Sequence, residues 1–113
     1  MPGLFAGLHD LLARYGTRSW AELLAPAIAL AADGFPAHGQ LIRNTEARAD
    51  LIAKDAECTR LFMPGGKPFG EGAPVRQPEL AETLTRVAGD GPGGFYSGPV
   101  AARLADGIVA AGG

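Results

Sequence analysis

The sequence has few of the residues from which active sites are usually built. It holds one cysteine and two histidines among 113 residues. A single cysteine excludes an internal disulfide, and Cys58, His9 and His38 are too scattered to predict a metal site of three or four ligands. The formal net charge is -2, which gives no electrostatic basis for binding nucleic acid or an anionic membrane. No apolar run approaches the roughly 20 residues that a membrane span needs.

Strand patterns are also missing. No run alternates apolar and polar residues for long enough to predict a convincing strand, and there is no internal repeat. Apolar residues recur instead at helical spacing. The sequence therefore predicts an all-α fold, an array of short helices with Gly/Pro-rich loops. We expect residues 1–113 to form a single helical segment with no internal boundary.

Glycine and proline are abundant, at 17 and 9 residues, and they mark the ends of the predicted elements. Helices are predicted at Leu4–Tyr15, Trp20–Leu24, Pro26–Ala32, Leu41–Ala53, Pro78–Gly89 and Pro99–Gly112. Residues 63–74 predict a loop or short hairpin, and residues 91–94 predict a turn. Phe35-Pro36 predicts extended backbone, and we expect the aromatic pair Phe95-Tyr96 to enter the core.

Pro26 lies inside a stretch that is otherwise well suited to one helix. Ser19 and Glu22 match the S-x-x-E capping box, and Gly34 suits the left-handed residue that closes a helix. Pro26 lacks the amide that would bond to the carbonyl of Glu22, which costs about 3 kcal/mol in a helix interior. We therefore expect a break, with Pro26 starting a second short helix.

Three features resemble catalytic or binding motifs, but each has a plainer interpretation. Gly16-Thr17 could be a self-cleaving pair that frees a threonine nucleophile, yet hydroxyl residues are ordinary in turns between helices. The glycine-rich stretch 65–72 holds Lys67 but follows no predicted strand, which favours turn residues over a phosphate cradle. Cys58 has no histidine near it in sequence, and a lone cysteine usually packs as a small apolar residue.

The histidines and acids allow equally plain interpretations. His9 lies off the apolar stripe of its helix and is expected to be a solvated polar residue, and His38 lies in a loop. Glu79 and Glu82 lie where helix termini and exposed faces favour acids. The sequence therefore predicts no catalytic, cofactor-binding or metal-binding residue in this chain, and no cofactor.

A series of short motifs nevertheless resembles a known family. The motifs are Pro2-Gly3, Ala6-Gly7, Tyr15-Gly16, WAELLAPAI (20–28), LAADGFP (30–36), QPELA (77–81), FYSG (95–98) and AAGG (110–113). Together they resemble the large subunit of gamma-glutamyltranspeptidase, also called glutathione hydrolase. The resemblance covers the whole chain, and although single motifs are weak, eight in order are specific.

The resemblance implies a parent with the αββα sandwich of an N-terminal-nucleophile hydrolase. Such a precursor cleaves itself into a large and a small subunit, and the threonine freed on the small subunit attacks gamma-glutamyl amides of the glutathione type. The gamma-glutamyl group then passes to water or to an amino acid. In the family the WAELLAPAI run turns at its proline, which implies that Pro26 is an architectural joint.

The family's functional residues have no counterpart in this chain. The resemblance places its substrate-carboxylate arginine before Pro2, and its threonine, oxyanion-hole glycines and glutamyl-binding residues beyond Gly113. Thr17 corresponds to a variable turn residue. The implied partners are the rest of the large subunit and the small subunit, in a bacterial parent that is periplasmic or secreted.

Two further expectations concern the ends and the apolar faces of the chain. Its first and last residues suggest a piece of a longer protein. If its helices cover a sheet in that protein, apolar residues should stay exposed and the fragment should self-associate; these residues are Leu8, Leu11, Leu12, Leu24, Ile28, Leu84 and Ile108. Two functional classes stay open: a scaffold segment that is inactive alone, and a free-standing helical interaction module.

Overall fold

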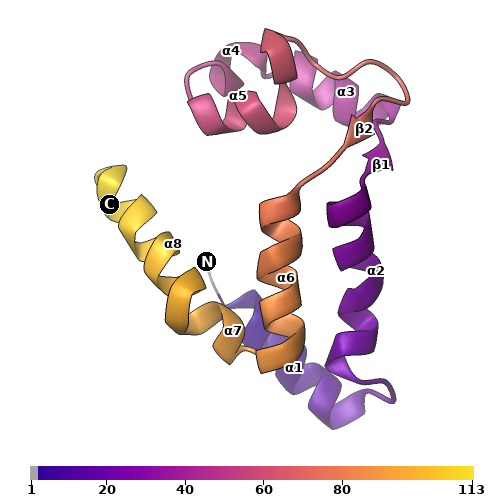
Figure 1. Ribbon diagram of the computed structural model, residues 1–113, viewed down its shortest axis with the longest axis vertical. Coiled ribbons are helices and arrows are strands. Elements are labelled where there is room, and N and C mark those ends of the chain that lie inside the picture. Colours follow the sequence, from indigo (N-terminus) through magenta and orange to yellow (C-terminus); the bar gives the residue numbers. More distant parts are fainter. Residues whose placement is uncertain (1–2) are drawn as a thin grey trace. The chain divides into compact units, whose positions relative to one another are not determined.

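The structure is a computed structural model that describes residues 3–113. Its helices are α1 (Leu4–Tyr15), α2 (Trp20–Asp33), α3 (Gly39–Glu46), α4 (Ala49–Ile52), α5 (Ala56–Phe62), α6 (Pro78–Asp90), α7 (Gly93–Tyr96) and α8 (Gly98–Ala110) (Figure 1). The short elements are the 3-10 helix η1 (Pro64–Gly66) and the strands β1 (Phe35–Pro36) and β2 (Pro74–Val75). The all-α prediction is confirmed, because each strand has only two residues.

The chain divides into two compact units. The first consists of the chain up to Ala29 and of Pro78–Gly113, and it contains α1, α6, α7 and α8 together with most of α2. The second unit is Leu30–Gln77 and contains the end of α2, both strands, α3, α4, α5 and η1. That residues 1–113 form one segment without an internal boundary stays a prediction.

Helix α2 does not break at Pro26, so the prediction of two short helices is wrong. One helix runs from Trp20 to Asp33 with Pro26 inside it. Pro26 is exposed, so no packed neighbour forces the chain to turn there. The free-energy cost of Pro26 therefore comes from one missing amide hydrogen bond and from crowding of the preceding turn. The other hydrogen bonds of α2 keep the helix continuous.

Both ends of α2 form as the sequence predicts. The Ser19 amide and hydroxyl donate to the Glu22 carboxylate at 2.8 and 2.7 Å, and the Glu22 amide donates to the Ser19 hydroxyl at 3.2 Å. This is a complete capping box. At the other end Gly34 has φ of 94°, a left-handed conformation that residues with a Cβ rarely adopt.

The first unit is held together by close packing of α6 and α7. A Cβ on Gly94 would lie 2.5 Å from the carbonyl oxygen of Arg86, so only glycine lets α7 approach the backbone of α6 at this point. The indole N–H of Trp20 donates to the carbonyl oxygen of Val87 at 2.8 Å, which ties the start of α2 to α6. Helix α8 then packs against α7.

The second unit is organised by the pairing of β1 with β2. The strands are antiparallel, with Phe35 opposite Val75, which confirms the predicted extended backbone at Phe35-Pro36. The Ala37 amide donates to the Ala73 carbonyl at 2.8 Å and extends the pairing into the glycine-rich loop. Within residues 63–74, η1 is followed by this loop and Pro74 begins β2; because β2 pairs with the distant β1, the stretch is the predicted loop and not a hairpin.

The predicted helix at Leu41–Ala53 is interrupted between α3 and α4. Arg48 has φ -123° and ψ 14°, outside the helical region, and its amide bonds to the Thr45 carbonyl at 3.2 Å in a tightened turn. Thr45 is buried, and its hydroxyl donates to the Leu41 carbonyl at 2.9 Å. Neither glycine nor proline lies at this turn, so the sequence carries no signal for it.

Two short helices were not predicted. Helix α5 begins after Asp55, whose carboxylate accepts from the Cys58 amide at 2.7 Å. An Asp at the N-cap followed by Glu57 in the first turn is a recognisable start signal. Helix α7 occupies part of the predicted 91–94 turn and includes Phe95.

The buried core of the described residues is small and consists mostly of small side chains. Among the described residues the buried apolar ones are Ala31, Ala37, Met63, Val75, Ala81, Val87 and Val100. The list contains no leucine, isoleucine or aromatic residue. Because the free energy of burial scales with apolar area, this core contributes little for a chain of this length.

We expect Pro26→Ala to raise the free energy of unfolding by about 1–2 kcal/mol. Alanine restores an amide donor in the interior of α2, a gain that its freer unfolded chain partly offsets. Thermal and urea denaturation followed by circular dichroism measure the change. Ala27→Gly, at the next exposed position of α2, is the matched control and should lower stability by about 1 kcal/mol. A lower stability in Pro26→Ala would instead mean that the proline is needed as a joint.

The capping box gives α2 a defined dependence on pH. Hydrogen bonds from the Ser19 hydroxyl, and then from its amide, lower the pKa of Glu22 in the folded chain. A pKa lowered by folding stabilises the folded state above the unfolded-state pKa, and this contribution is lost as the pH falls through the folded-state pKa. Glu22→Gln keeps the box but cannot titrate, so its unfolding should vary less with acid than that of the wild type. Identical acid dependence in both proteins would contradict this assignment.

Candidate functional site

The candidate residues named from the sequence are divided between the two units. Thr17 lies exposed in the bend between α1 and α2, and His38 lies exposed just before α3. Residues 65–72 form a loop in which Gly65, Gly66 and Gly72 have positive φ, as turn glycines do. Across residues 3–113, no three His, Cys, Asp or Glu side chains gather to hold a metal ion. None of the described helices is long and apolar enough to cross a membrane.

His9 is a packing residue, so the prediction of a solvated side chain is wrong. It is half-buried, and its ring meets the Trp20 indole edge to face with a centroid distance of 5.4 Å. Aromatic rings prefer this geometry. The spacing of apolar residues in α1 placed His9 outside the apolar stripe. It could not show that Trp20, at the start of α2, packs against the His9 ring.

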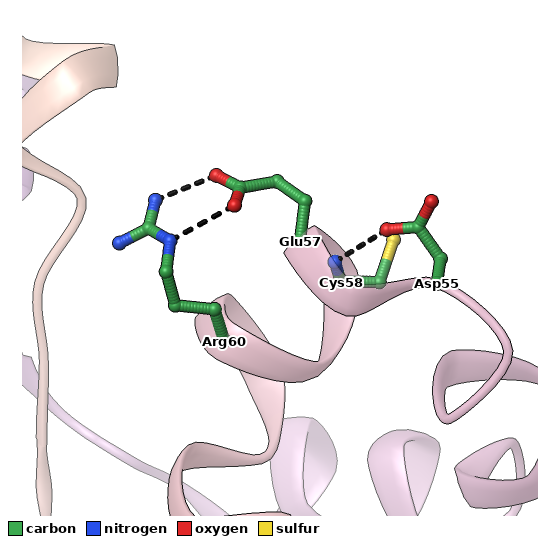
Figure 2. A network of polar contacts seen from close by, with 4 residues as sticks. All are labelled: Asp55, Glu57, Cys58 and Arg60. Carbon is green, nitrogen blue, oxygen red and sulfur yellow. Dashed lines mark hydrogen bonds and ion pairs between the residues drawn. The ribbon is translucent and has the colours of Figure 1, made fainter. Parts of the chain in front are cut away.

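Cys58 lies in a polar network at the start of α5 (Figure 2). Asp55 accepts from the Cys58 amide, and Arg60 makes a two-point contact with Glu57 through bonds of 3.0 and 2.6 Å. The thiol hydrogen bond to the Asp55 carboxylate raises the pKa of Cys58, and burial raises it further. A raised pKa keeps the thiol protonated, which is the opposite of what a nucleophilic cysteine needs.

An open groove lies between α1 and α2 in the first unit. It encloses about 460 Å³. Its walls are Phe5, Leu8, Leu11, Leu12, Tyr15, Gly16, Trp20, Leu23 and Leu24. Leu8, Leu11 and Tyr15 are 44%, 55% and 77% exposed, and α1 has no buried residue. We call this feature the α1/α2 groove.

The groove is held in shape partly by contacts between α1 and α7. The Phe5 ring lies 4.8 Å from the Phe95 ring, and the Tyr96 hydroxyl accepts from the Ala6 amide at 3.2 Å. That amide is in the first turn of α1, where no intrahelical partner exists. The predicted core pair is therefore half correct: Phe95 is half-buried against Phe5, whereas Tyr96 is exposed and caps α1.

A second groove lies within the other unit. It encloses about 340 Å³ between α3, α4 and α5. It is lined by Leu41, Asn44, Thr45, Arg48, Leu51, Ile52, Cys58 and Phe62. Its polar and apolar side chains are mixed, and the Thr45 hydroxyl is already bonded to the backbone of α3. The arrangement offers no pair of groups suited to proton transfer or nucleophilic attack.

The predicted exposed apolar residues are partly confirmed. Leu8, Leu11 and Ile108 are exposed. The other four, Leu12, Leu24, Ile28 and Leu84, are half-buried. The sequence predicted that Leu8, Leu11 and Leu12 of α1 stay exposed. It carried no signal that they line a groove with α2. Self-association of the fragment stays a prediction.

The chain belongs to the gamma-glutamyltranspeptidase family, whose family model matches residues 1–113. It is 36% identical to glutathione hydrolase 3 of Arabidopsis thaliana over 113 residues, which are all of this chain and 18% of the relative. It is 34% identical to the glutathione hydrolase proenzyme of Bacillus subtilis (strain 168), of which it covers 19%. It is also 36% identical to the acylase ACY 1 proenzyme of Pseudomonas sp. (strain SE83), of which it covers 20%.

Solved structures agree with this assignment. The transpeptidase CapD of Bacillus anthracis matches 94% of this chain with a TM-score of 0.86 and 31% identity, over 37% of its own chain. The gamma-glutamyltranspeptidase of Helicobacter pylori matches 90% with a TM-score of 0.85 and 30% identity, over 30% of its own chain.

The chain spans about a fifth of the length of the curated relatives it matches. It is therefore a fragment of the large subunit, as the sequence predicts. The relatives come from plants, fungi and bacteria, so they do not single out the bacterial parent expected from the sequence.

We expect Asp55→Asn to make the Cys58 thiol react faster with iodoacetamide at mildly alkaline pH. Asparagine can still cap α5, but it removes the charge that raises the pKa of Cys58. Glu57→Gln is the control, because Glu57 makes a smaller contribution to that pKa, and it should accelerate the reaction less. Equal rates in the wild type and Asp55→Asn would show that the carboxylate does not control the thiol.

Proposed function

We propose that this chain is a scaffold segment of a gamma-glutamyltransferase or glutathione hydrolase and is inactive alone. The whole protein transfers gamma-glutamyl groups from glutathione-like amides to water or to amino acids. Within it, the segment positions surrounding elements and supplies no reacting group. Its partners are the remainder of the large subunit and the small subunit, in an αββα N-terminal-nucleophile fold.

The mismatch between a small core and exposed large apolar side chains carries this proposal. The buried apolar side chains among the described residues are alanine, valine and methionine, while several leucines on α1 and α2 stay exposed. Soluble monomers rarely expose contiguous apolar patches of more than a few hundred Å². A segment that is one fifth of its relatives' length has ample further chain against which to bury these residues.

The residues of the chain support a structural role over a chemical one. Thr17 and His38 are both exposed, and Thr17 lies in the bend between α1 and α2. The Cys58 thiol, with its raised pKa, is held protonated by Asp55. Transfer of a gamma-glutamyl group requires an activated nucleophile beside a base, and these groups do not provide that pair.

Substrate choice is also expected to lie outside the segment. The chain is 36% identical both to glutathione hydrolase 3 and to the acylase ACY 1 proenzyme. Proteins named for different activities are thus equally similar to it. A segment that serves both kinds of protein fits a common framework better than a specificity pocket.

The free-standing interaction module is the second candidate. The observation that favours this second candidate is the α1/α2 groove, whose exposed apolar residues offer a docking surface. The two candidates differ in what the gene encodes. A reading frame that continues into a small subunit with a threonine cleavage site supports the scaffold, and a stop codon directly after Gly113 supports the module.

The purified 113-residue chain should not hydrolyse gamma-glutamyl-p-nitroanilide above background. The reason is that no described residue forms a nucleophile and base pair with the geometry that acyl transfer needs. The Bacillus subtilis glutathione hydrolase, assayed in parallel, is the positive control. Activity that co-purifies with the chain and disappears in Thr17→Ala would overturn the proposal.

A further inference from the structure

The second unit is a stretch of chain whose two ends are joined to each other, because β1 near its start pairs with β2 near its end (Figure 1). We propose that residues 38–71, which we call the helical arm, open locally while the two ends stay fastened. The fastening consists of residues 31–37 and 72–77, and we call it the clasp. This motion takes place within one unit and does not require the proposed scaffold function.

Hydrogen bonds join the two sides of the clasp. The Gln77 amide donates to the Ala31 carbonyl at 2.9 Å, and the Arg76 Nε–H donates to the Asp33 carbonyl at 2.9 Å. Both carbonyls belong to the last turn of α2, where no intrahelical donor is available. The segment that leaves the unit therefore caps the helix that enters it, and the β1/β2 pair continues the fastening.

The clasp is also closely packed. Val75, Ala37 and Ala31 are 1%, 2% and 7% exposed. A Cβ on Gly34 would lie 2.7 Å from the Cγ of Arg76, and the φ of Gly34 is 94°, so glycine is required for the two sides to approach. Opening the clasp would break its hydrogen bonds and expose its buried side chains together, which makes the opening costly.

The arm has much weaker internal support. Its helices α3, α4 and α5 have 8, 4 and 7 residues, fewer than the roughly 12–15 at which an isolated helix is even marginally stable. Thr45 and Met63 are the buried residues of the arm, and Leu51 is 65% exposed. The groove of about 340 Å³ also lies between these three helices. Segments with few buried apolar contacts open at the lowest free-energy cost.

The clasp gives this local opening a defined limit. While the clasp is closed, the two ends of the open arm remain together, so the arm does not lose the entropy of loop closure again when it re-forms. The arm therefore opens and closes without unfolding the rest of the unit. Gly34, Arg76 and Gln77 set this limit through contacts that lie outside the arm.

Native-state hydrogen exchange of the 113-residue chain in low urea tests the proposal. Ile52 and Met63 in the arm, and Ala37 and Gln77 in the clasp, have amide hydrogen bonds of similar length, 2.8 to 2.9 Å. The two arm amides should exchange at least about tenfold faster than the two clasp amides. Exchange in the arm should depend little on urea, whereas exchange in the clasp should depend on urea as steeply as global unfolding does.

Gly34→Ala and Gly66→Ala form a matched pair of variants. Both glycines have positive φ, 94° and 79°, so alanine is strained at either position. A Cβ at Gly66, in the arm, meets nothing within 4 Å, whereas a Cβ at Gly34 meets Arg76. Gly34→Ala should speed exchange at Ala37 and Gln77 at least about tenfold, and Gly66→Ala should change it by less than about twofold.

The same measurements can contradict the proposal. Equal exchange of the arm and clasp amides in the unmodified chain, whether fast or slow, would show that the arm does not open separately. An equal effect of Gly34→Ala and Gly66→Ala on the clasp amides would show that arm and clasp unfold together. If Gly34→Ala does not fold, exchange of the unmodified chain still decides between these outcomes.

Discussion

The structure depends on how little apolar surface its helices can bury against one another. The hydrophobic effect is the main favourable term in folding, yet among the described residues the buried apolar side chains are alanine, valine and one methionine. The leucines of α1 and α2 remain exposed around a preformed groove. This imbalance is the observation on which the proposed scaffold role rests.

Specific hydrogen bonds compensate locally for the small core. The Trp20 indole bonds to the backbone of α6, the Tyr96 hydroxyl caps α1, and Asp55 caps α5. Each of these bonds satisfies a polar group that would otherwise lack a partner, and such bonds fix geometry more than they add stability. The contacts of Trp20 and Tyr96 set the orientation of α1 and therefore the shape of the groove.

Relatives of different named activities within the gamma-glutamyltranspeptidase family share this helical segment. The relatives include glutathione hydrolases and an acylase at similar identity, and the matched segment is a minor part of each chain. A helical framework can be kept while the reacting groups beyond it change, because function is carried by sites placed on a fold. Cys58 is consistent with this separation, because the hydrogen bond to Asp55 raises the pKa of its thiol, the opposite of what a nucleophile needs.

The sequence by itself determined the local elements and the family. The α1 stripe, the Ser19–Glu22 box and Gly34 predicted helices and ends that the structure contains, because these signals act over one or two turns. Only the tertiary structure decided the rest. It showed that Pro26 stays inside one helix, that the chain turns at Arg48 without glycine or proline, and that His9 packs under Trp20. The groove also required the structure, because its walls belong to two helices and their approach depends on contacts between residues far apart in the chain.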